Sequence, residues 1–118
     1  MNAFLTFHLG KYKRFSFAVK HSDTNLPEDI TAHSFTFTVK KSRNDTAALI
    51  EKTSDDGISV VSGAGGTGQI EIAPEDYAAI PYVDQDVEWD LQIVRDDVPE
   101  ILDSGKGVIR VPVTRVAT

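Results

Sequence analysis

Apolar and polar residues alternate repeatedly along this chain, which is the pattern of a β-strand that buries one of its two faces. The longest alternating run is Asp86–Arg95. Its apolar positions all fall on one face, and they are Val87, Trp89, Leu91 and Ile93. We expect this strand to lie at the centre of the hydrophobic core.

Four further runs show the same alternation and predict strands that complete the core. Their apolar positions are Phe15, Phe17 and Val19; Phe35, Phe37 and Val39; Ile70 and Ile72; and Ile109, Val111 and Val113. Pro112 has no N–H to donate to a sheet, so the last run predicts an edge strand or a bulge. Shorter strand candidates are Phe4–Leu9, Ala48–Lys52, Ile58–Val61 and Glu100–Ser104.

Clusters of Gly, Pro and Asp separate these runs and predict turns. The clusters are Asp23–Asp29, Ser42–Asp45, Asp55–Gly57, Gly63–Gly68, Asp96–Pro99 and Gly105–Gly107. Short strands at this spacing predict an all-β fold, an immunoglobulin-like antiparallel β-sandwich of seven to nine short strands. One short helix is predicted near 74–80, because Pro74 suits the first helical position and Pro81 ends the segment.

The length of 118 residues predicts a single domain, 1–118, with one core. There is no cysteine, so neither a disulfide nor a cysteine zinc site is available and packing must stabilise the fold. The first residues, Met1–Lys11, lack a basic stretch ahead of an apolar run, which predicts no secretory signal and synthesis in the cytoplasm. The apolar stretches are far shorter than a membrane-spanning helix, so no membrane is expected as a partner.

The net charge of −6 disfavours nucleic acid as a partner, because phosphate backbones require clustered Lys and Arg. The charge is uneven along the chain. Residues 1–43 carry seven basic and three acidic residues, whereas residues 44–118 carry five basic and fifteen acidic ones. Such a division can steer copies of a protein together, or it can be an unevenly charged, solvated surface.

The segment Gly63–Gly68 matches the dinucleotide-binding pattern G-x-G-x-x-G. In that motif the last glycine opens a helix that holds the pyrophosphate, but here a strand pattern follows, with Ile70 and Ile72. We therefore interpret the glycines as a hairpin loop. No Lys follows them, which excludes a P-loop.

Other candidate chemistry has structural interpretations. Asp84, Asp86, Glu88 and Asp90 are expected on one solvated face of a strand, spaced too widely for a calcium shell. A glycosidase pair of carboxylates has no positive support in the sequence and stays open. His8, His21 and His33 are widely spaced, and no G-x-S-x-G is present. We assign no catalytic, cofactor-binding or metal-ligating residue, expect no cofactor, and expect no enzymatic activity.

The order of the strand patterns is similar to that of the immunoglobulin-like N-terminal domain of phage and prophage baseplate upper proteins. The matching segments are Phe15–Val19, Leu26–Thr31, Phe35–Lys40, Gly68–Ile72 with Glu75-Asp76, Glu88–Ile93, and Gly107–Val111 with Val113-Thr114. The resemblance implies a virion structural component, in the tail or baseplate, that assembles with copies of itself and with other tail proteins. Family members continue into a further region that does not follow Thr118 here, so a small tail or head-tail accessory is an equal expectation.

Two functions follow as hypotheses. The first is a non-catalytic virion structural or assembly protein that acts through protein–protein contacts and forms a homo-oligomer. The alternative is a ligand-binding sandwich module, such as a carbohydrate-binding domain, which requires an exposed aromatic platform. Trp89 shares its face with core positions, so the candidates for a platform are Tyr12, Tyr77 and Tyr82.

Overall fold

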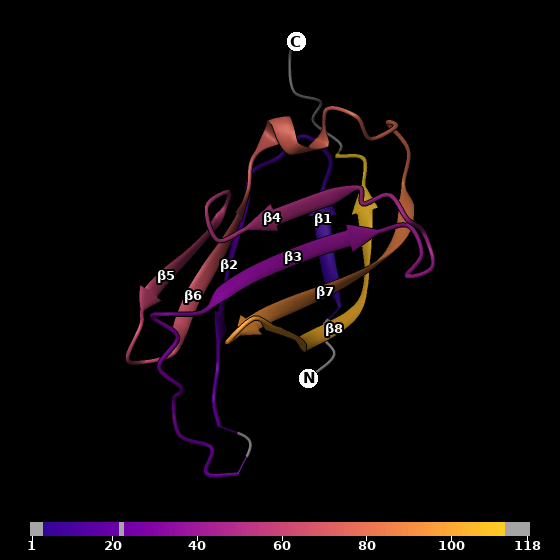
Figure 1. Ribbon diagram of the computed structural model, residues 1–118. Coiled ribbons are helices and arrows are strands. Elements are labelled where there is room, and N and C mark those ends of the chain that lie inside the picture. Colours follow the sequence, from indigo (N-terminus) through magenta and orange to yellow (C-terminus); the bar gives the residue numbers. More distant parts are fainter. Residues whose placement is uncertain (1–3, 22, 113–118) are drawn as a thin grey trace.

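The computed structural model describes residues 4–21 and 23–112, and within them two β-sheets pack face to face (Figure 1). The larger sheet has the order β1 (Leu5–His8), β8 (Val98–Arg110), β7 (Gln85–Arg95), β3 (Ser34–Lys40) and β4 (Ile50–Thr53). The smaller sheet has the order β2 (Lys13–Ala18), β6 (Thr67–Ile72) and β5 (Ile58–Ser62). The predicted all-β sandwich is therefore confirmed, with eight strands in the described residues.

The strand order is that of an immunoglobulin-like sandwich. The sheet β2-β6-β5 corresponds to strands B, E and D, and β8-β7-β3-β4 corresponds to strands G, F, C and C′ of the variable type. One pairing corrects the expectation of an antiparallel fold, because β1 lies parallel to β8, with Phe7 opposite Ile109. His8, the last residue of β1, lies opposite Arg110, the last residue of β8. Both strands therefore run toward the same end of the sandwich, where the chain passes from β1 to β2 of the smaller sheet.

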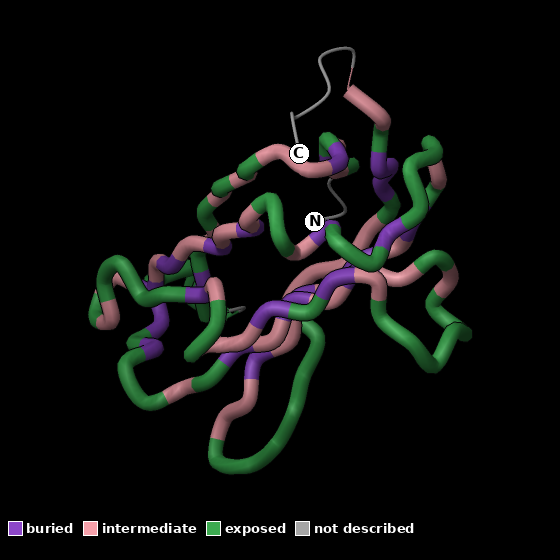
Figure 2. The backbone as a smooth tube through the Cα atoms, turned by 90° about the horizontal axis from the view of Figure 1, so that it is seen from above, coloured by how far each residue is buried: buried purple, intermediate pink, exposed green. Residues whose placement is uncertain are grey.

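The core lies between the sheets and consists mainly of the positions that alternation marked. Figure 2 shows buried residues recurring along the strands and exposed residues along the long connections. Of the predicted core positions, Phe15, Phe17 and Val111 are half-buried against the core, and Val113 lies outside the described residues. The others are buried. Phe7, Ile30 and Tyr77 are also buried, although no long alternating run contains them.

Two local predictions are wrong, and a third is confirmed in a shorter form. Gly105–Gly107 is not a turn, because β8 continues through it, paired with β7 along its length and interrupted by an irregularity opposite Leu91/Gln92. The short helix predicted near 74–80 is confirmed as a single 3₁₀ turn, Pro74–Tyr77. Pro112 is neither in an edge strand nor in a bulge, because β8 ends at Arg110.

Two residues, Asp96 and Asp97, form the turn of the β7–β8 hairpin. Both lie within the cluster Asp96–Pro99, which was predicted to be a turn. Asp96 and Asp97 have φ angles of 49° and 65°, the left-handed conformation that a two-residue type I′ turn requires at both central positions. Pro99 lies within β8 rather than in the turn. The tight turn brings β7 and β8 together as the long central pair that carries the candidate site.

Candidate functional site: a hollow on the outer face of the larger sheet

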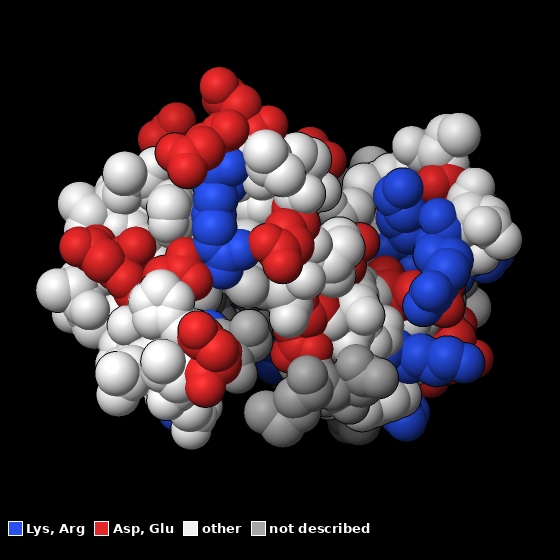
Figure 3. All heavy atoms as spheres, turned by 60° about the horizontal axis from the view of Figure 1, so that its bottom comes forward, with Lys and Arg blue, Asp and Glu red and all other residues white. Residues whose placement is uncertain are grey.

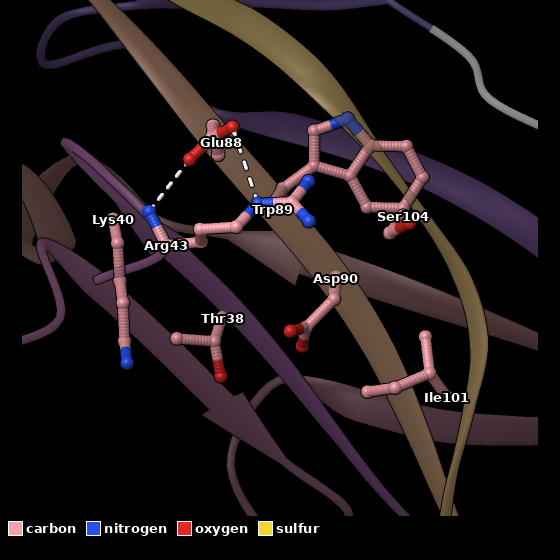
Figure 4. A pocket seen from close by; sticks show the side chains of 8 residues that line it. All are labelled: Thr38, Lys40, Arg43, Glu88, Trp89, Asp90, Ile101 and Ser104. Atoms are coloured by element: carbon pink, nitrogen blue, oxygen red, sulfur yellow. Dashed lines mark hydrogen bonds and ion pairs between the residues drawn. The ribbon is translucent and has the colours of Figure 1, made fainter. Parts of the chain in front are cut away.

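Paired residues of adjacent strands point to the same face of a sheet, so the register places polar side chains of three strands in rows. Thr38 of β3 lies opposite Asp90 of β7, which lies opposite Ser104 of β8. These rows line a hollow of about 280 Å³ on the outer face of the larger sheet, hereafter the sheet hollow (Figure 4). Its lining residues are Thr38, Lys40, Arg43, Glu88, Trp89, Asp90, Ile101 and Ser104.

One margin of the sheet hollow is fixed by an ion pair. Arg43, in the β3–β4 connection, donates its backbone N–H to Glu88 Oε2 at 2.6 Å, and its Nε lies 3.4 Å from Glu88 Oε1. Figure 4 shows both interactions reaching from the connection to β7. The backbone hydrogen bond, with the Arg43 charge, holds the pKa of Glu88 below its ordinary value. Glu88 therefore stays ionised and ties the connection to the sheet.

Asp90 lies in the sheet hollow without such a partner: among the described residues, no hydrogen bond or ion pair joins its carboxylate. Burial raises the pKa of Asp90 above its ordinary value, and the positive charges of Lys40 and Arg43 oppose the rise. The prediction of a plainly solvated acidic face thus holds for Asp84 and Asp86, which are exposed, but not for Glu88 and Asp90, which are half-buried. Asp84 also precedes β7, and it accepts a hydrogen bond from the Val111 N–H at 2.6 Å.

A second group of charges gathers at the far end of β7. Arg95 donates from Nε and Nη2 to the two oxygens of Glu28, at 2.6 and 2.8 Å, and from Nη1 to Glu100. His33 Nε2 lies 3.3 Å and His21 Nδ1 lies 3.9 Å from the Glu28 carboxylate. The pKa of Glu28 lies below its ordinary value, chiefly because of the Arg95 hydrogen bonds. Sequence spacing did not reveal this cluster, because a long connection brings Glu28 to Arg95.

The Glu28 cluster predicts a pH dependence of stability. The folded pKa of Glu28 is lowered, so the stability from its pairing is fully present above the unfolded value near 4.5 and is lost as pH falls through the folded value. Urea unfolding measured between about pH 5.5 and about pH 3 should show a smaller loss of stability in Glu28→Gln than in the wild type. Since all other carboxylates titrate in both proteins, an equal loss in the two would contradict the assignment.

A third cluster centres on a buried lysine. Lys52 is 5% exposed and donates from Nζ to both carboxylate oxygens of Asp76 at 3.0 Å, with Asp56 Oδ1 at 3.4 Å. Asp76 also accepts the Ala73 N–H at 2.7 Å. Burial by itself lowers the pKa of Lys52, but Asp76 and then Asp56 outweigh it and the pKa lies above its ordinary value. The cluster joins β4 to the 3₁₀ turn and acts as a structural tie.

Gly57 makes room for that lysine. A Cβ at this position would lie 2.2 Å from Lys52 Cε and 2.8 Å from the Glu71 carbonyl oxygen, and φ is +98°. Both the space and the backbone conformation therefore require glycine here.

The aromatic candidates for a ligand platform separate into buried and exposed residues. Trp89 is 7% exposed and donates from Nε1 to the Lys106 carbonyl at 3.2 Å, so its predicted core role is confirmed. Tyr77 is buried, and burial, followed by the Asp76 charge, raises its pKa to about 12. Tyr12 and Tyr82 are exposed. They lie in connections at the same end of the sandwich, because β1 ends beside the residues where β7 begins.

The remaining sequence candidates are structural. Residues 63–66, which are glycines except for Ala64, form the β5–β6 hairpin loop, and β6 follows them where a nucleotide motif would have a helix. In the described ranges, no group of three or more His, Asp or Glu side chains is arranged to hold a metal ion. Likewise, no helix in the described part of the chain is long and apolar enough to cross a membrane.

The uneven charge of the sequence is partly balanced within the fold. Glu28–Arg95 and Arg43–Glu88 each join a residue of the first 43 to one of the remainder. Figure 3, which brings the bottom of Figure 1 forward, shows basic side chains gathered mainly on one side of this face and acidic side chains over the rest of it, some of them beside the basic ones.

A scan against protein-family models and a search of curated proteins find no match to this chain. The fold defines its class as an all-β sandwich of two sheets, and its charged clusters mostly tie its own segments together. The sheet hollow is an open pocket lined by polar groups from several strands.

Proposed function

We propose that this chain is a non-catalytic structural or assembly component of a phage or prophage particle, in the tail or baseplate, that acts through protein–protein contacts. The sheet hollow carries the proposal. Its lining combines the Arg43–Glu88 ion pair, the exposed Ile101 and two hydroxyl side chains, those of Thr38 and Ser104. This mixture of charged, polar and apolar groups is suited to contact with another protein surface. Glu88 and Asp90 project from one strand and do not face each other across a cleft, as the carboxylates of a glycosidase do.

The placement in a phage particle rests on the resemblance of the strand pattern, and the immunoglobulin-like strand order is compatible with it. The proposed partners are other virion or tail proteins and further copies of this chain. The proposed location is the virion. Nucleic acid and membrane are not proposed as partners, in keeping with a net charge of −6.

The proposal is tested by the presence of the protein in particles. Particles purified from cells that carry the gene should contain it, and Ile101→Glu should reduce its recovery there more than tenfold, because a charge enters the sheet hollow. Val98→Glu is the matched control, because Val98 is equally apolar and exposed on β8 but lies at the hairpin outside the hollow. It should leave recovery unchanged.

Light scattering after gel filtration, at low and high salt, supplies the second measurement. Discrete oligomers, or a wild-type protein recovered with particles, support the proposal. A strict monomer at every concentration that is also never recovered with particles contradicts it.

The alternative of a carbohydrate-binding module depends on Tyr12 and Tyr82, which are exposed at one end of the sandwich. Tyr77 no longer contributes to that platform because it is buried. Binding on a glycan array that is lost in Tyr12→Ala or Tyr82→Ala would favour this alternative over an assembly role. Silence on the array would remove it.

A further inference from the structure

The sheet hollow contains polar side chains that have no partner within the chain. Thr38, Asp90 and Ser104 lie in one row across β3, β7 and β8, and all three line the hollow. Among the residues that the structure describes, neither the Asp90 carboxylate nor the two hydroxyl groups make a hydrogen bond or an ion pair. The central acids of the other clusters differ, because Glu28 and Asp76 each accept hydrogen bonds from a cation. The hollow therefore presents an acid and two hydroxyls to a group from outside the chain.

Asp90 carries a charge that no bonded cation balances. Glu88, the other acid of the lining, already has its ion pair with Arg43. Lys40 also lines the hollow, but in the described part of the chain no ion pair joins it to Asp90. Figure 4 shows Lys40 on one side of Thr38 and the Asp90 carboxylate on the other. Burial disfavours the charged form of Asp90, so a cation that bonds to this carboxylate from outside would offset an existing cost.

The size and the lining of the hollow suit one long side chain. Pockets for drug-sized ligands measure about 300–1,000 Å³, and the hollow, at about 280 Å³, falls just below that range. Ile101 is 52% exposed and forms an apolar part of the same lining. An acid and an apolar wall in one hollow match a side chain that has a methylene stem and a cationic head.

We propose that the sheet hollow binds an arginine side chain from the surface of a partner protein, with Asp90 as the anchoring carboxylate. A guanidinium group presents five N–H donors in a planar fork, so two of them can bind both oxygens of Asp90 while others reach the hydroxyls of Thr38 and Ser104. The methylene stem packs against Ile101. A lysine ammonium is a point charge and lacks this match to a carboxylate. The inference rests on the proposed function, because it names the partner chemistry of the same hollow.

Charge complementarity argues for a basic protein as the occupant. The net charge of −6 attracts a basic partner at long range and repels an acidic one. Arginine is also enriched at the centres of protein–protein interfaces. Within residues 4–21 and 23–112, no group of three or more His, Asp or Glu side chains is arranged to hold a metal ion, so a bare metal cation finds no ligand set here.

An NMR titration of the wild-type protein with the peptide acetyl-Gly-Arg-Gly-amide tests the inference at low salt. One side chain supplies little affinity, so we expect a dissociation constant of about 1–10 mM, with shifts concentrated at the amides of Thr38, Asp90 and Ser104. The same peptide with citrulline in place of arginine keeps the shape and loses the charge, and it should bind at least about tenfold more weakly. Absence of binding at about 20 mM arginine peptide, or equal binding of the two peptides, would overturn the inference.

Three variants locate the contact. Asp90→Asn should weaken binding of the arginine peptide at least about tenfold. Asp86→Asn is the matched control, because Asp86 lies two pairs of faces away on the same outward side of β7, is exposed and does not line the hollow; it should change binding less than about twofold. Lys40→Met removes a positive charge that repels the guanidinium and should strengthen binding about two- to fivefold. Circular dichroism and urea unfolding check that all three fold.

The outcomes of these variants decide between a built contact and a diffuse one. Equal weakening in Asp90→Asn and Asp86→Asn would show attraction to the acidic surface as a whole and would refute the inference. Weaker binding in Lys40→Met would mean that the hollow selects an anionic group, which refutes it as well.

Recovery with particles separates this inference from the proposed function. Asp90→Asn should be recovered with particles at least about tenfold less than the wild type, and Asp86→Asn should be recovered in full. A wild-type protein found in particles, with recovery unaffected by Asp90→Asn, refutes the arginine contact alone. Binding of the arginine peptide in the hollow of a protein that is never found in particles refutes the particle role alone.

Discussion

Replacing Phe37 by Ala is expected to destabilise the protein by about 3–5 kcal/mol. Phe37 is fully buried, and its ring lies 5.4 Å from that of Phe15, 5.9 Å from Trp89 and 6.4 Å from Phe7, measured between ring centroids. Phe15 belongs to the smaller sheet and the other three rings to the larger one. The substitution therefore leaves a cavity where the two sheets meet, and neither sheet can close over it without leaving the other.

Urea unfolding measures this loss. Small domains have free energies of unfolding of about 5–15 kcal/mol, so the variant should unfold at a much lower urea concentration or be unfolded without urea. Phe4→Ala removes the same side chain at a position that is 64% exposed, and its effect should stay within about 0.5 kcal/mol. Equal effects of the two substitutions would show that Phe37 does not hold the sheets together.

Replacing Lys52 by Met is expected to cost about 2–3 kcal/mol, although Met keeps most of the apolar stem. The ammonium group is removed, and Asp76 loses the cation that faces both of its oxygens. Asp76 is 22% exposed, so water offsets part of the loss and the cost stays below that of a fully buried pair.

A double-mutant cycle separates the ion pair from packing. Lys52→Met together with Asp76→Asn should be less destabilising than the two single changes added, by about 1–3 kcal/mol, because the double variant leaves no unpaired charge. Lys40→Met, on the outer face of β3, is the control, and should change stability by about 0.5 kcal/mol or less. Strict additivity in the cycle would mean that the loss in Lys52→Met does not come from the ion pair with Asp76.

The candidate sites were predictable only where a single strand determines them. Asp90 and Glu88 were correctly placed on the outward side of their strand, since a strand alternates its faces. The hollow was not predictable, because Thr38 and Ser104 join Asp90 only through the register of three strands. The cluster around Glu28 was not predictable either, because Arg95 is far from Glu28 in the sequence. His21 and His33 also lie beside the Glu28 carboxylate only in the folded chain.

The wrong prediction of a turn at Gly105–Gly107 has a physical cause. Gly105–Gly107 has the composition of a turn, and no local pattern opposes that interpretation. In the fold β7 pairs along the whole of β8, and the ladder overrides the local preference of two glycines. A Cβ on Gly107 would lie 2.4 Å from the Leu5 carbonyl oxygen, so this glycine permits the close approach of β1 rather than a turn.

The sequence by itself determined the all-β class, most of the strands and most of the core, because a period of two in hydrophobicity depends only on neighbouring residues. The tertiary structure alone decided which strands are neighbours and that β1 runs parallel to β8. It also decided which charges are balanced within the molecule. These properties depend on contacts between residues far apart in the chain, and no local pattern encodes such contacts.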